Sequence, residues 1–128
     1  MIILIDTSTP ICHLVMIDGH THVSREWQAD RDLAHGLLRW LNDQLGDQGK
    51  NIHDITAIGV YQGPGSFTGL RIGLTVMNTL ADGLDIPIVA ARGDDWQQVA
   101  LSALRSGGND RIVLPLYDRD ANITTPRK

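Results

Sequence analysis

A tight turn between two apolar stretches places the strongest constraint on the fold of this chain. The first stretch covers residues 55–61, the second covers residues 70–84, and the sequence GPGS fills positions 63–66 between them. A short apolar run, then glycine and proline, then a longer apolar run at helical spacing is typical of a strand, a turn and a helix. The sequence therefore predicts a strand at 55–61 and a helix that begins at Phe67.

Four residues set the shape of this turn. Pro64 fixes one φ angle, and Gly63 and Gly65 on either side of it can adopt φ angles that other residues resist. Ser66 is a good N-cap for the helix, because its hydroxyl can accept a hydrogen bond from an early backbone N–H. The turn is therefore expected to be compact.

Functional and structural interpretations of the turn remain open on chemistry alone. A glycine-rich turn from strand to helix points backbone N–H groups along the helix start, so it could hold a phosphate. The lysine of a Walker-type loop is absent, and the spacing differs from the dinucleotide fingerprint. Ser66 also lacks the G-x-S-x-G context of a nucleophile elbow. We favour the plainest interpretation, a tight structural connection.

The length and charge of the chain limit its organisation and its ligands. With 128 residues it suits one domain, and a chain of this size buries roughly two-thirds of the surface that its unfolded form exposes. We expect that domain to span residues 1–117, and we expect residues 118–128 to form a loose tail because they lack apolar periodicity. The net charge of −4 argues against nucleic-acid binding through the field of the chain alone.

The single cysteine and the first residues suggest a compartment. Cys12 has no second cysteine with which to form an internal disulfide, which suits a reducing cytoplasm, and we expect it to be a small buried residue of a strand. The first strand runs straight into Asp6 without a basic region or a cleavage site, and no apolar run approaches membrane-spanning length. We therefore expect a soluble, cytoplasmic protein without membrane contact.

Three strands are predicted before the first helix, at residues 1–5, 11–17 and 20–27. The first is continuously apolar and rich in β-branched residues, as in a strand covered on both faces. Asp18-Gly19 is a strong two-residue hairpin signal between the other two. Pairing across that turn places Leu14 opposite Val23 and Met16 opposite Thr21.

The opposite face of this hairpin is predicted to carry three imidazoles, from His13, His20 and His22. Three imidazoles on one face suggest a metal site. However, no cysteine or convincing carboxylate ligand accompanies them. Solvated strand histidines are the favoured interpretation, and no metal is expected.

Three helices are predicted, at residues 32–45, 67–83 and 93–105. The first carries leucines at helical spacing, with Gly46 as its C-terminal stop. The second is apolar over most of its circumference, so it is not expected to have a fully wet face. One line of its apolar residues includes Leu70 and Met77, and a second line consists of Ile72, Val76 and Leu80.

Two further strands are predicted, at residues 87–91 and 111–117. The chain then reads as an antiparallel meander of three strands followed by alternating helices and strands. This order predicts the α/β class, with a mixed sheet, three antiparallel leading strands and helices on the faces of the sheet.

The run GPGSFTGLRIGL at 63–74, together with Asp-Thr-Ser-Thr after the first strand, resembles the TsaB (YeaZ) family. That family is the glycoprotease-like, non-catalytic partner of TsaD in bacterial tRNA threonylcarbamoyladenosine synthesis. The resemblance covers residues 1 to about 91. The matching motif residues are Asp6, Thr7, Ser8, Thr9, Gly63, Pro64, Gly65, Ser66, Phe67, Thr68, Gly69 and Arg71. The resemblance implies a ribonuclease H-like half-domain, as in actin-like and sugar-kinase-like ATPases.

The chain departs from this family in two ways. Similar proteins usually carry a second, related half after the third helix, so this chain looks like a short form with the first half alone. A histidine is expected near the start of the first helix, and the chain has Leu33 there, with His35 a little later. No catalytic residue, metal or cofactor is therefore expected.

Two functions from different classes remain open. The resemblance implies a scaffold subunit that binds TsaD and supports threonylcarbamoyl transfer to the adenosine next to the tRNA anticodon. TsaE is then expected to join the assembly, and tRNA to be contacted only within it. The alternative is a nucleotide-binding, phosphotransferase-type half-domain that acts as a homodimer and uses Asp6 and the turn at 63–68.

The partner surface is expected on the first two helices, which carry more apolar surface than one sheet face can cover. Proteins similar to this one pair through these helices, with themselves and with TsaD. We therefore expect a homodimer through the same face, with Gly36 and Gly73 allowing close approach. The candidate contacts are Leu33, Gly36, Leu37, Trp40, Leu70, Gly73, Met77 and Leu80.

Overall fold

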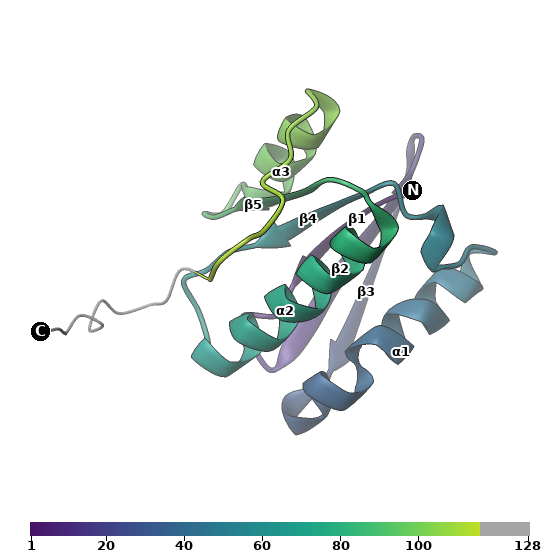
Figure 1. Ribbon diagram of the computed structural model, residues 1–128. Helices are drawn as coiled ribbons and strands as arrows, with labels where there is room; N and C mark the ends of the chain where they lie inside the picture. Colours follow the sequence, from purple (N-terminus) through teal and green to yellow (C-terminus); the bar gives the residue numbers. More distant parts are fainter. Residues whose placement is uncertain (116–128) are drawn as a thin grey trace, which may run out of the picture.

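A mixed sheet of five strands forms the centre of the molecule (Figure 1). The structure is a computed structural model that describes residues 1–115, apart from the side chain of Phe67. The strands are β1 (Ile2–Asp6), β2 (Ile11–Asp18), β3 (Thr21–Gln28), β4 (Ala57–Tyr61) and β5 (Ile88–Ala91). Their order in the sheet is β3-β2-β1-β4-β5. The first three are antiparallel, and β4 and β5 run parallel to β1.

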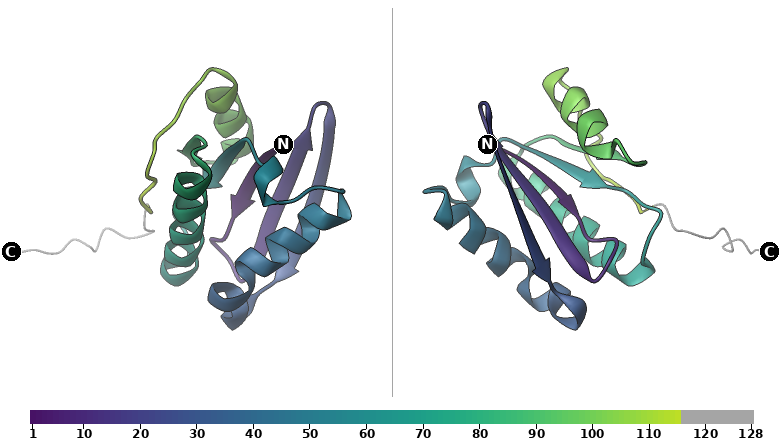
Figure 2. Two further views of the ribbon diagram at one scale, coloured as in Figure 1. Left: turned by 45° about the vertical axis from the view of Figure 1, so that its right-hand side comes forward. Right: turned by 180° about the vertical axis from the view of Figure 1, so that it is seen from behind.

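Three helices cover the two faces of the sheet (Figure 2). They are α1 (Leu33–Asp47), α2 (Phe67–Leu84) and α3 (Trp96–Arg105), and short 3-10 turns lie at Asp30–Asp32 and Ile52–Asp54. Helices α1 and α2 pack side by side on one face, and α3 packs on the other. This arrangement confirms the predicted α/β class with a mixed sheet and helices on its faces.

Strand β1 is covered on both faces, as its continuous apolar sequence predicted. Ile3 and Ile5 point into the core beneath α1 and α2, and Leu4 points into the smaller cluster beneath α3. All three side chains are at most 2% exposed. The central strand therefore joins the two layers of helices.

The predicted register of the β2–β3 hairpin is wrong by two residues. Leu14 lies opposite Arg25 and Met16 lies opposite Val23, because the two loop residues are Gly19 and His20 instead of Asp18 and Gly19. Gly19 has a φ of 63°, which suits glycine at the first position of such a turn. A shift of two residues keeps each side chain on its predicted face, and both faces of β2 are buried: Leu14 and Met16 belong to the core beneath α1 and α2, and Val15 and Ile17 belong to the cluster beneath α3.

Helix α1 continues beyond the predicted stop. Gly46 lies inside the helix, and the positive φ that ends such helices occurs three residues later, at Gly49. Helix α3 begins at Trp96, later than the predicted residue 93. Within the described residues, no helix is both long and apolar enough to cross a lipid bilayer.

The residues after α3 are tied to the sheet edge and to α2 without forming the strand predicted at 111–117. Asp110 N donates to Ile88 O at 2.7 Å, and side-chain oxygens of Asn109 and Asp110 accept from the backbone N–H groups of Ile88 and Ala90. The Asn78 side chain binds both the N–H and the carbonyl of Val113, each at 2.8 Å. Residues 111–115 form no strand. Residues 116–117 and the predicted tail at 118–128 lie outside the described part of the chain.

Candidate functional site

The two sequence motifs meet at the carboxyl ends of β1 and β4, which are neighbouring parallel strands. Asp6 ends β1, and its Oδ1 accepts a hydrogen bond from Ser8 N at 2.8 Å, which fixes the turn after the strand. Ser8 O in turn accepts from Ser66 N at 2.9 Å, so the first turn is joined to the glycine turn by its backbone. One backbone N–H group of the turn at 63–66, that of Ser66, is therefore already bound within the chain.

Thr7 fills the space that the helix glycines leave. Its Oγ1 donates to Gly69 O at 2.8 Å, and the residue is only 4% exposed. A Cβ at Gly69 would meet the Thr7 carbonyl oxygen, and a Cβ at Gly73 would lie 2.7 Å from Thr7 Cγ2. The glycines of α2 therefore allow the Asp-Thr-Ser-Thr turn to pack against the helix backbone.

The other motif residues divide between this packed turn and the surface. A Cβ at Gly65 would lie 2.5 Å from Ser8 Cβ, and Pro64 O accepts from the Tyr61 hydroxyl at 2.8 Å. Ser66 caps α2 as predicted, because its Oγ accepts from Gly69 N at 3.4 Å. These contacts favour the structural interpretation of the turn. Thr9, Thr68 and Arg71 are exposed, and Gly63 is buried with a φ of 118°.

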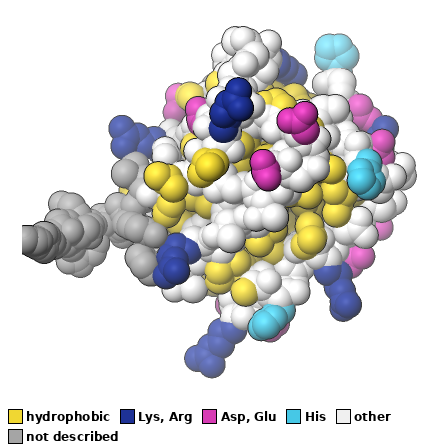
Figure 3. Space-filling view, viewed as in Figure 1, with side chains coloured by type: hydrophobic (Ala, Val, Ile, Leu, Met, Phe, Trp, Pro, Cys, Tyr) yellow, Lys and Arg dark blue, Asp and Glu magenta, His cyan; other side chains and the backbone are white. Residues whose placement is uncertain are grey.

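The outward face of α1 and α2 is hollowed along the line where the two helices meet (Figure 3). One hollow on this face has a volume of about 450 Å³. The lining residues are Ala34, His35, Leu38, Thr75, Val76, Thr79, Leu80, Gly83 and Leu84. A second hollow shares Ala34, Thr75 and Val76 with the first and adds Thr68, Arg71 and Ile72. We call this continuous depression the α1–α2 groove.

Several predicted partner contacts lie inside the chain instead. Leu37, Leu70 and Met77 are 0% exposed, and Leu33 is 5% exposed, because all four belong to the core between the helices and the sheet. Their assignment as partner contacts is therefore corrected. Leu80 is half-buried and lines the groove, so it remains a candidate contact.

The two glycines and the tryptophan of the predicted interface also face their own chain. A Cβ at Gly36 would lie 2.8 Å from the ring of Trp27 on β3, and Trp40 stacks on that same ring with 5.4 Å between the ring centroids. Gly73 accommodates Thr7, as described above. The close approaches expected at these glycines are real, but each is made by a sheet or turn residue of the same chain.

The groove residues that the prediction missed are less conspicuous in the sequence. Leu38 is 46% exposed, and Val76 is half-buried, on the second apolar line of α2. Thr75 and Thr79 are exposed beside that line. The signal was the second apolar line of α2, which consists of Ile72, Val76 and Leu80, and the prediction included only Leu80 from it.

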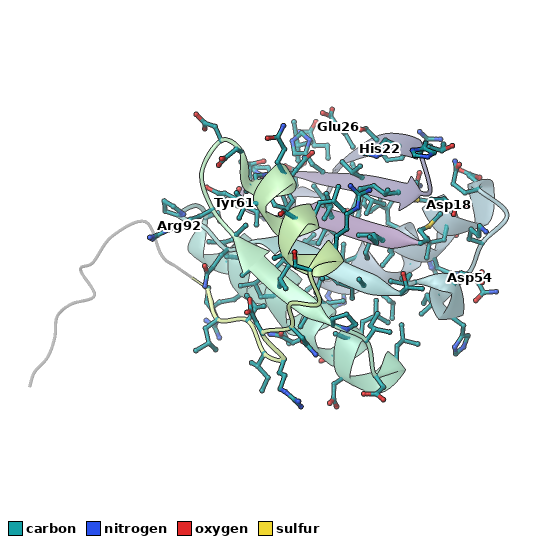
Figure 4. The ribbon with its side chains drawn as sticks, turned by 90° about the horizontal axis from the view of Figure 1, so that it is seen from above. Asp18, His22, Glu26, Asp54, Tyr61 and Arg92 are labelled. Carbon is teal, nitrogen blue, oxygen red and sulfur yellow. The ribbon has the colours of Figure 1, made fainter. Side chains whose placement is uncertain are left out.

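The histidines of the hairpin do not form a metal site. His13 pairs with Glu26 across the strands, with 3.1 Å between Nδ1 and Oε2, while His20 lies in the turn and His22 pairs with Ile17. Figure 4 shows Glu26 and His22 on β3. Among residues 1–115, no group of three or more His, Cys, Asp or Glu side chains is placed to hold a metal ion.

Cys12 is not placed for nucleophilic chemistry. It is buried on β2, as predicted from the sequence. Burial, with a smaller contribution from the negative charge of Asp6, raises the pKa of its thiol to about 12. The thiolate, which is the nucleophilic form, is therefore scarce at neutral pH.

Comparison with known proteins identifies relatives of this chain. It is 29% identical over 122 residues to the tRNA threonylcarbamoyladenosine biosynthesis protein TsaB of Escherichia coli (strain K12), a match that covers 95% of this chain and 52% of that protein. It is 38% identical over 61 residues to the tRNA N6-adenosine threonylcarbamoyltransferase of Staphylococcus aureus (strain Newman), covering 48% of this chain and 18% of that protein.

A solved structure agrees with these relatives. YeaZ from Pseudomonas aeruginosa superposes with a TM-score of 0.68 at 30% identity, over 83% of this chain and 49% of the other. The chain thus spans about half the length of the E. coli and P. aeruginosa proteins. The family described as "TsaD: tRNA N6-adenosine threonylcarbamoyltransferase" matches residues 27–119. The chain therefore belongs to this glycoprotease-like family and, within it, to the TsaB (YeaZ) group.

Proposed function

We propose that this chain is a non-catalytic scaffold subunit that binds TsaD and supports threonylcarbamoyl transfer to the adenosine next to the tRNA anticodon. The α1–α2 groove is the observation that carries the proposal. Its floor and walls include exposed or half-buried apolar side chains, from Leu38 on α1 to Val76 and Leu80 on α2. Apolar patches rimmed by polar residues mark interaction sites.

The chemistry of the groove suits a helix from the partner. Leu38, Val76, Leu80 and Leu84 supply apolar contacts, and Thr75 and Thr79 supply a small polar edge. An amphipathic helix places apolar residues every three or four positions on one side, which matches a groove of this kind. TsaD is the proposed occupant.

The names of the relatives support the pathway. The E. coli relative is named as a tRNA threonylcarbamoyladenosine biosynthesis protein, and the S. aureus relative as the transferase itself. We extend this role to the chain, with TsaE joining the assembly and tRNA contacted only within it. The net charge of −4 agrees with a subunit that relies on its partners to bind RNA.

A non-catalytic role agrees with the chemistry of the motifs. The Asp6 carboxylate holds Ser8 N, and the glycine turn packs against Thr7 and Ser8. These groups therefore already serve the fold. The thiol of Cys12 is buried with a raised pKa, so it does not offer a nucleophile either.

A pair of matched substitutions tests the proposed face. Leu38 in the groove is 46% exposed, and Val99 on α3, on the other side of the sheet, is 47% exposed. Leu38→Glu should abolish co-purification with TsaD of the same genome, because it buries an unpaired charge at the contact. Val99→Glu should bind as the unmodified chain does, and both variants should melt normally.

The same pair can be tested in cells that depend on this chain for threonylcarbamoyladenosine. We expect the modified nucleoside in bulk tRNA to fall with Leu38→Glu and to stay unchanged with Val99→Glu. If the two variants bind TsaD equally well, the groove is not the docking face. If the unmodified chain does not bind TsaD at all, the proposed function is wrong.

A further inference from the structure

Strand β3 forms one edge of the sheet, and its outer side has unpaired backbone groups. The two-residue turn makes Asp18 and Thr21 a hydrogen-bonded pair, and such pairs alternate along the hairpin. The odd-numbered residues from 21 to 27 therefore direct their backbone groups to β2, and the even-numbered residues direct theirs outward. Within residues 1–115 no backbone group pairs with the outward groups, and Ser24 O accepts from the Arg25 guanidinium at 3.0 Å.

This strand lacks most of the features that keep an edge strand from pairing. Natural proteins protect such edges with proline, lysine, a bulge or a very short strand. The eight residues of β3 contain no proline and no lysine, and their register with β2 runs from Thr21 to Gln28 without a bulge. The Arg25 side chain covers one carbonyl, that of Ser24, and a carbonyl oxygen has a second lone pair with which to accept. The edge can therefore take another strand.

The side chains of β3 suit an added strand of the same kind. Val23 and Trp27 belong to the layer beneath α1 and are half-buried, so a neighbouring strand would cover part of their remaining surface. His22, Ser24 and Glu26 lie on the other side and are exposed. An added strand with the same alternation would bury its apolar residues beside Trp27 and keep its polar residues in water. Strand β3 itself has this alternation.

We propose that β3 pairs antiparallel with β3 of a second copy of this chain, about a two-fold axis at Ser24. A two-fold contact uses the same patch on both copies, so residue 24 lies opposite residue 24 and residue 22 lies opposite residue 26. The outward N–H and carbonyl of each Ser24 then bond those of the other copy. The two sheets of five strands become one continuous sheet.

The side chains that meet in this register are complementary. Glu26 of each copy lies opposite His22 of the partner subunit, and Trp27 lies opposite Thr21 of the partner subunit, which is a favourable aromatic and β-branched pair. Within the chain, Glu26 Oε2 is 3.1 Å from His13 Nδ1. The other carboxylate oxygen is therefore left for the second imidazole.

Neighbouring registers are less favourable. With the axis at Arg25, two guanidinium groups would lie opposite each other, and with the axis at Glu26, two carboxylates would. Like charges directly opposite each other destabilise a strand pair. An axis at Val23 avoids opposed charges but shortens the overlap to residues 21–25. The axis at Ser24 therefore gives the longest overlap without opposed like charges.

This contact leaves the α1–α2 groove free. The groove lies between the two helices, whereas β3 lies at the edge of the sheet (Figure 2). The pairing goes beyond the proposed function and does not depend on it. Two joined copies would each bind one TsaD.

Two substitutions of Ser24, compared by sedimentation equilibrium, test the pairing. Ser24→Pro removes an N–H that points away from β2, so the hairpin keeps its ladder while the dimer loses one hydrogen bond from each copy. We expect its dimer dissociation constant to rise roughly tenfold or more. Ser24→Ala keeps the N–H, so it should dimerise as the unmodified chain does. Thermal melting checks that both variants fold.

Disulfide cross-linking tests the register without a proline. Ser24→Cys places two thiols opposite each other across the axis, with Cα atoms about 5.5 Å apart, a distance that a disulfide spans. Gln28→Cys on the same edge places them about 27 Å apart, because each lies four residues from the axis. The native Cys12 is buried, so the unmodified chain serves as the blank. A covalent dimer on a non-reducing gel is expected with Ser24→Cys alone.

Three results would overturn the proposal. The first is a chain that stays monomeric at high concentration, and the second is a dimer that Ser24→Pro leaves unchanged, since it must form through another surface. The third is equal cross-linking of the two cysteine variants, which would show that the register is wrong. Ser24→Pro should bind TsaD as the unmodified chain does, so failure of this pairing and failure of the proposed function are observed separately.

Discussion

The inner and outer sides of α2 have opposite characters. On the inner side, Gly69 and Gly73 lie so close to Thr7 that a side chain at either position would collide with it. On the outer side, Thr75, Thr79 and neighbouring side chains are exposed beside the groove. Most residues that identify the family thus build the junction between two turns, while the proposed partner surface consists mainly of residues outside the motif and includes only Thr68, Arg71 and Ile72 from it. In this chain the motif mainly marks where the fold is fixed, and the proposed partner surface lies next to it.

Gly69→Leu, on the inner side of α2, should have the largest effect on stability. The new side chain would have to displace the carbonyl of Thr7, which is backbone that no rotamer change can move. We expect a loss of more than about 4 kcal/mol in the free energy of unfolding, or failure to fold. Denaturant unfolding or the soluble yield would measure it.

Gly83→Leu provides the control in the same helix. No atom lies within 4 Å of a Cβ built at Gly83, so the substitution should be tolerated. Equal stability of the two leucine variants would show that the packing of Thr7 against α2 adapts far more easily than the geometry indicates.

Gly36→Ala should have an intermediate effect on the other helix of this layer. The added Cβ would lie 2.8 Å from the Trp27 ring, which must then move out of its stack with Trp40. We expect a loss of about 1–3 kcal/mol, despite the higher helix propensity of alanine. The tryptophan emission spectrum should change with it.

Gly46→Ala in the same helix separates the effect of helix propensity from the effect of the contact with Trp27. It adds the same methyl group with nothing within 4 Å, so it should stabilise the protein by up to about 1 kcal/mol. If Gly36→Ala were as stable as Gly46→Ala, the contact with Trp27 would be unimportant.

Thr7→Val should have the smallest effect of the three. It keeps the shape of the side chain within the glycine-lined space but removes the hydrogen bond to Gly69 O, at a cost of about 1 kcal/mol. Thr9→Val also removes hydrogen bonds, between Thr9 Oγ1 and the backbone of Ile11, but water can replace them at this exposed position, so the cost should be less than about 0.5 kcal/mol. Thermal melting of both variants would compare them, and a larger loss for Thr9→Val would contradict this account of the junction.

The arrangement of strands and helices could be predicted because their periodicities are clear. The hairpin register could not, because Asp18-Gly19 and Gly19-His20 both make acceptable two-residue turns and both keep Leu14 and Met16 facing the core. Only the pairing of the complete strands decides between them.

The partner surface was harder to predict for a related reason. Helix α2 is apolar around most of its circumference, so the sequence does not reveal whether Met77 or Val76 faces the sheet. The structure shows which residue faces the sheet: Met77 lies in the core beneath the helix, and Val76 lies in the groove beside α1. The same limit applies to Gly36, because the sequence does not reveal that the ring of Trp27 on β3 packs against it.

The way in which Asn109 and Asp110 bind β5 limits how copies of this chain can polymerise. Their side chains occupy the backbone N–H groups of Ile88 and Ala90, which an added strand would need. Strand β3, at the other end of the sheet, has an open edge within the described residues. A sheet with one closed and one open edge can join only one other copy edge to edge, so growth by strand addition stops at two molecules and cannot extend into a fibre.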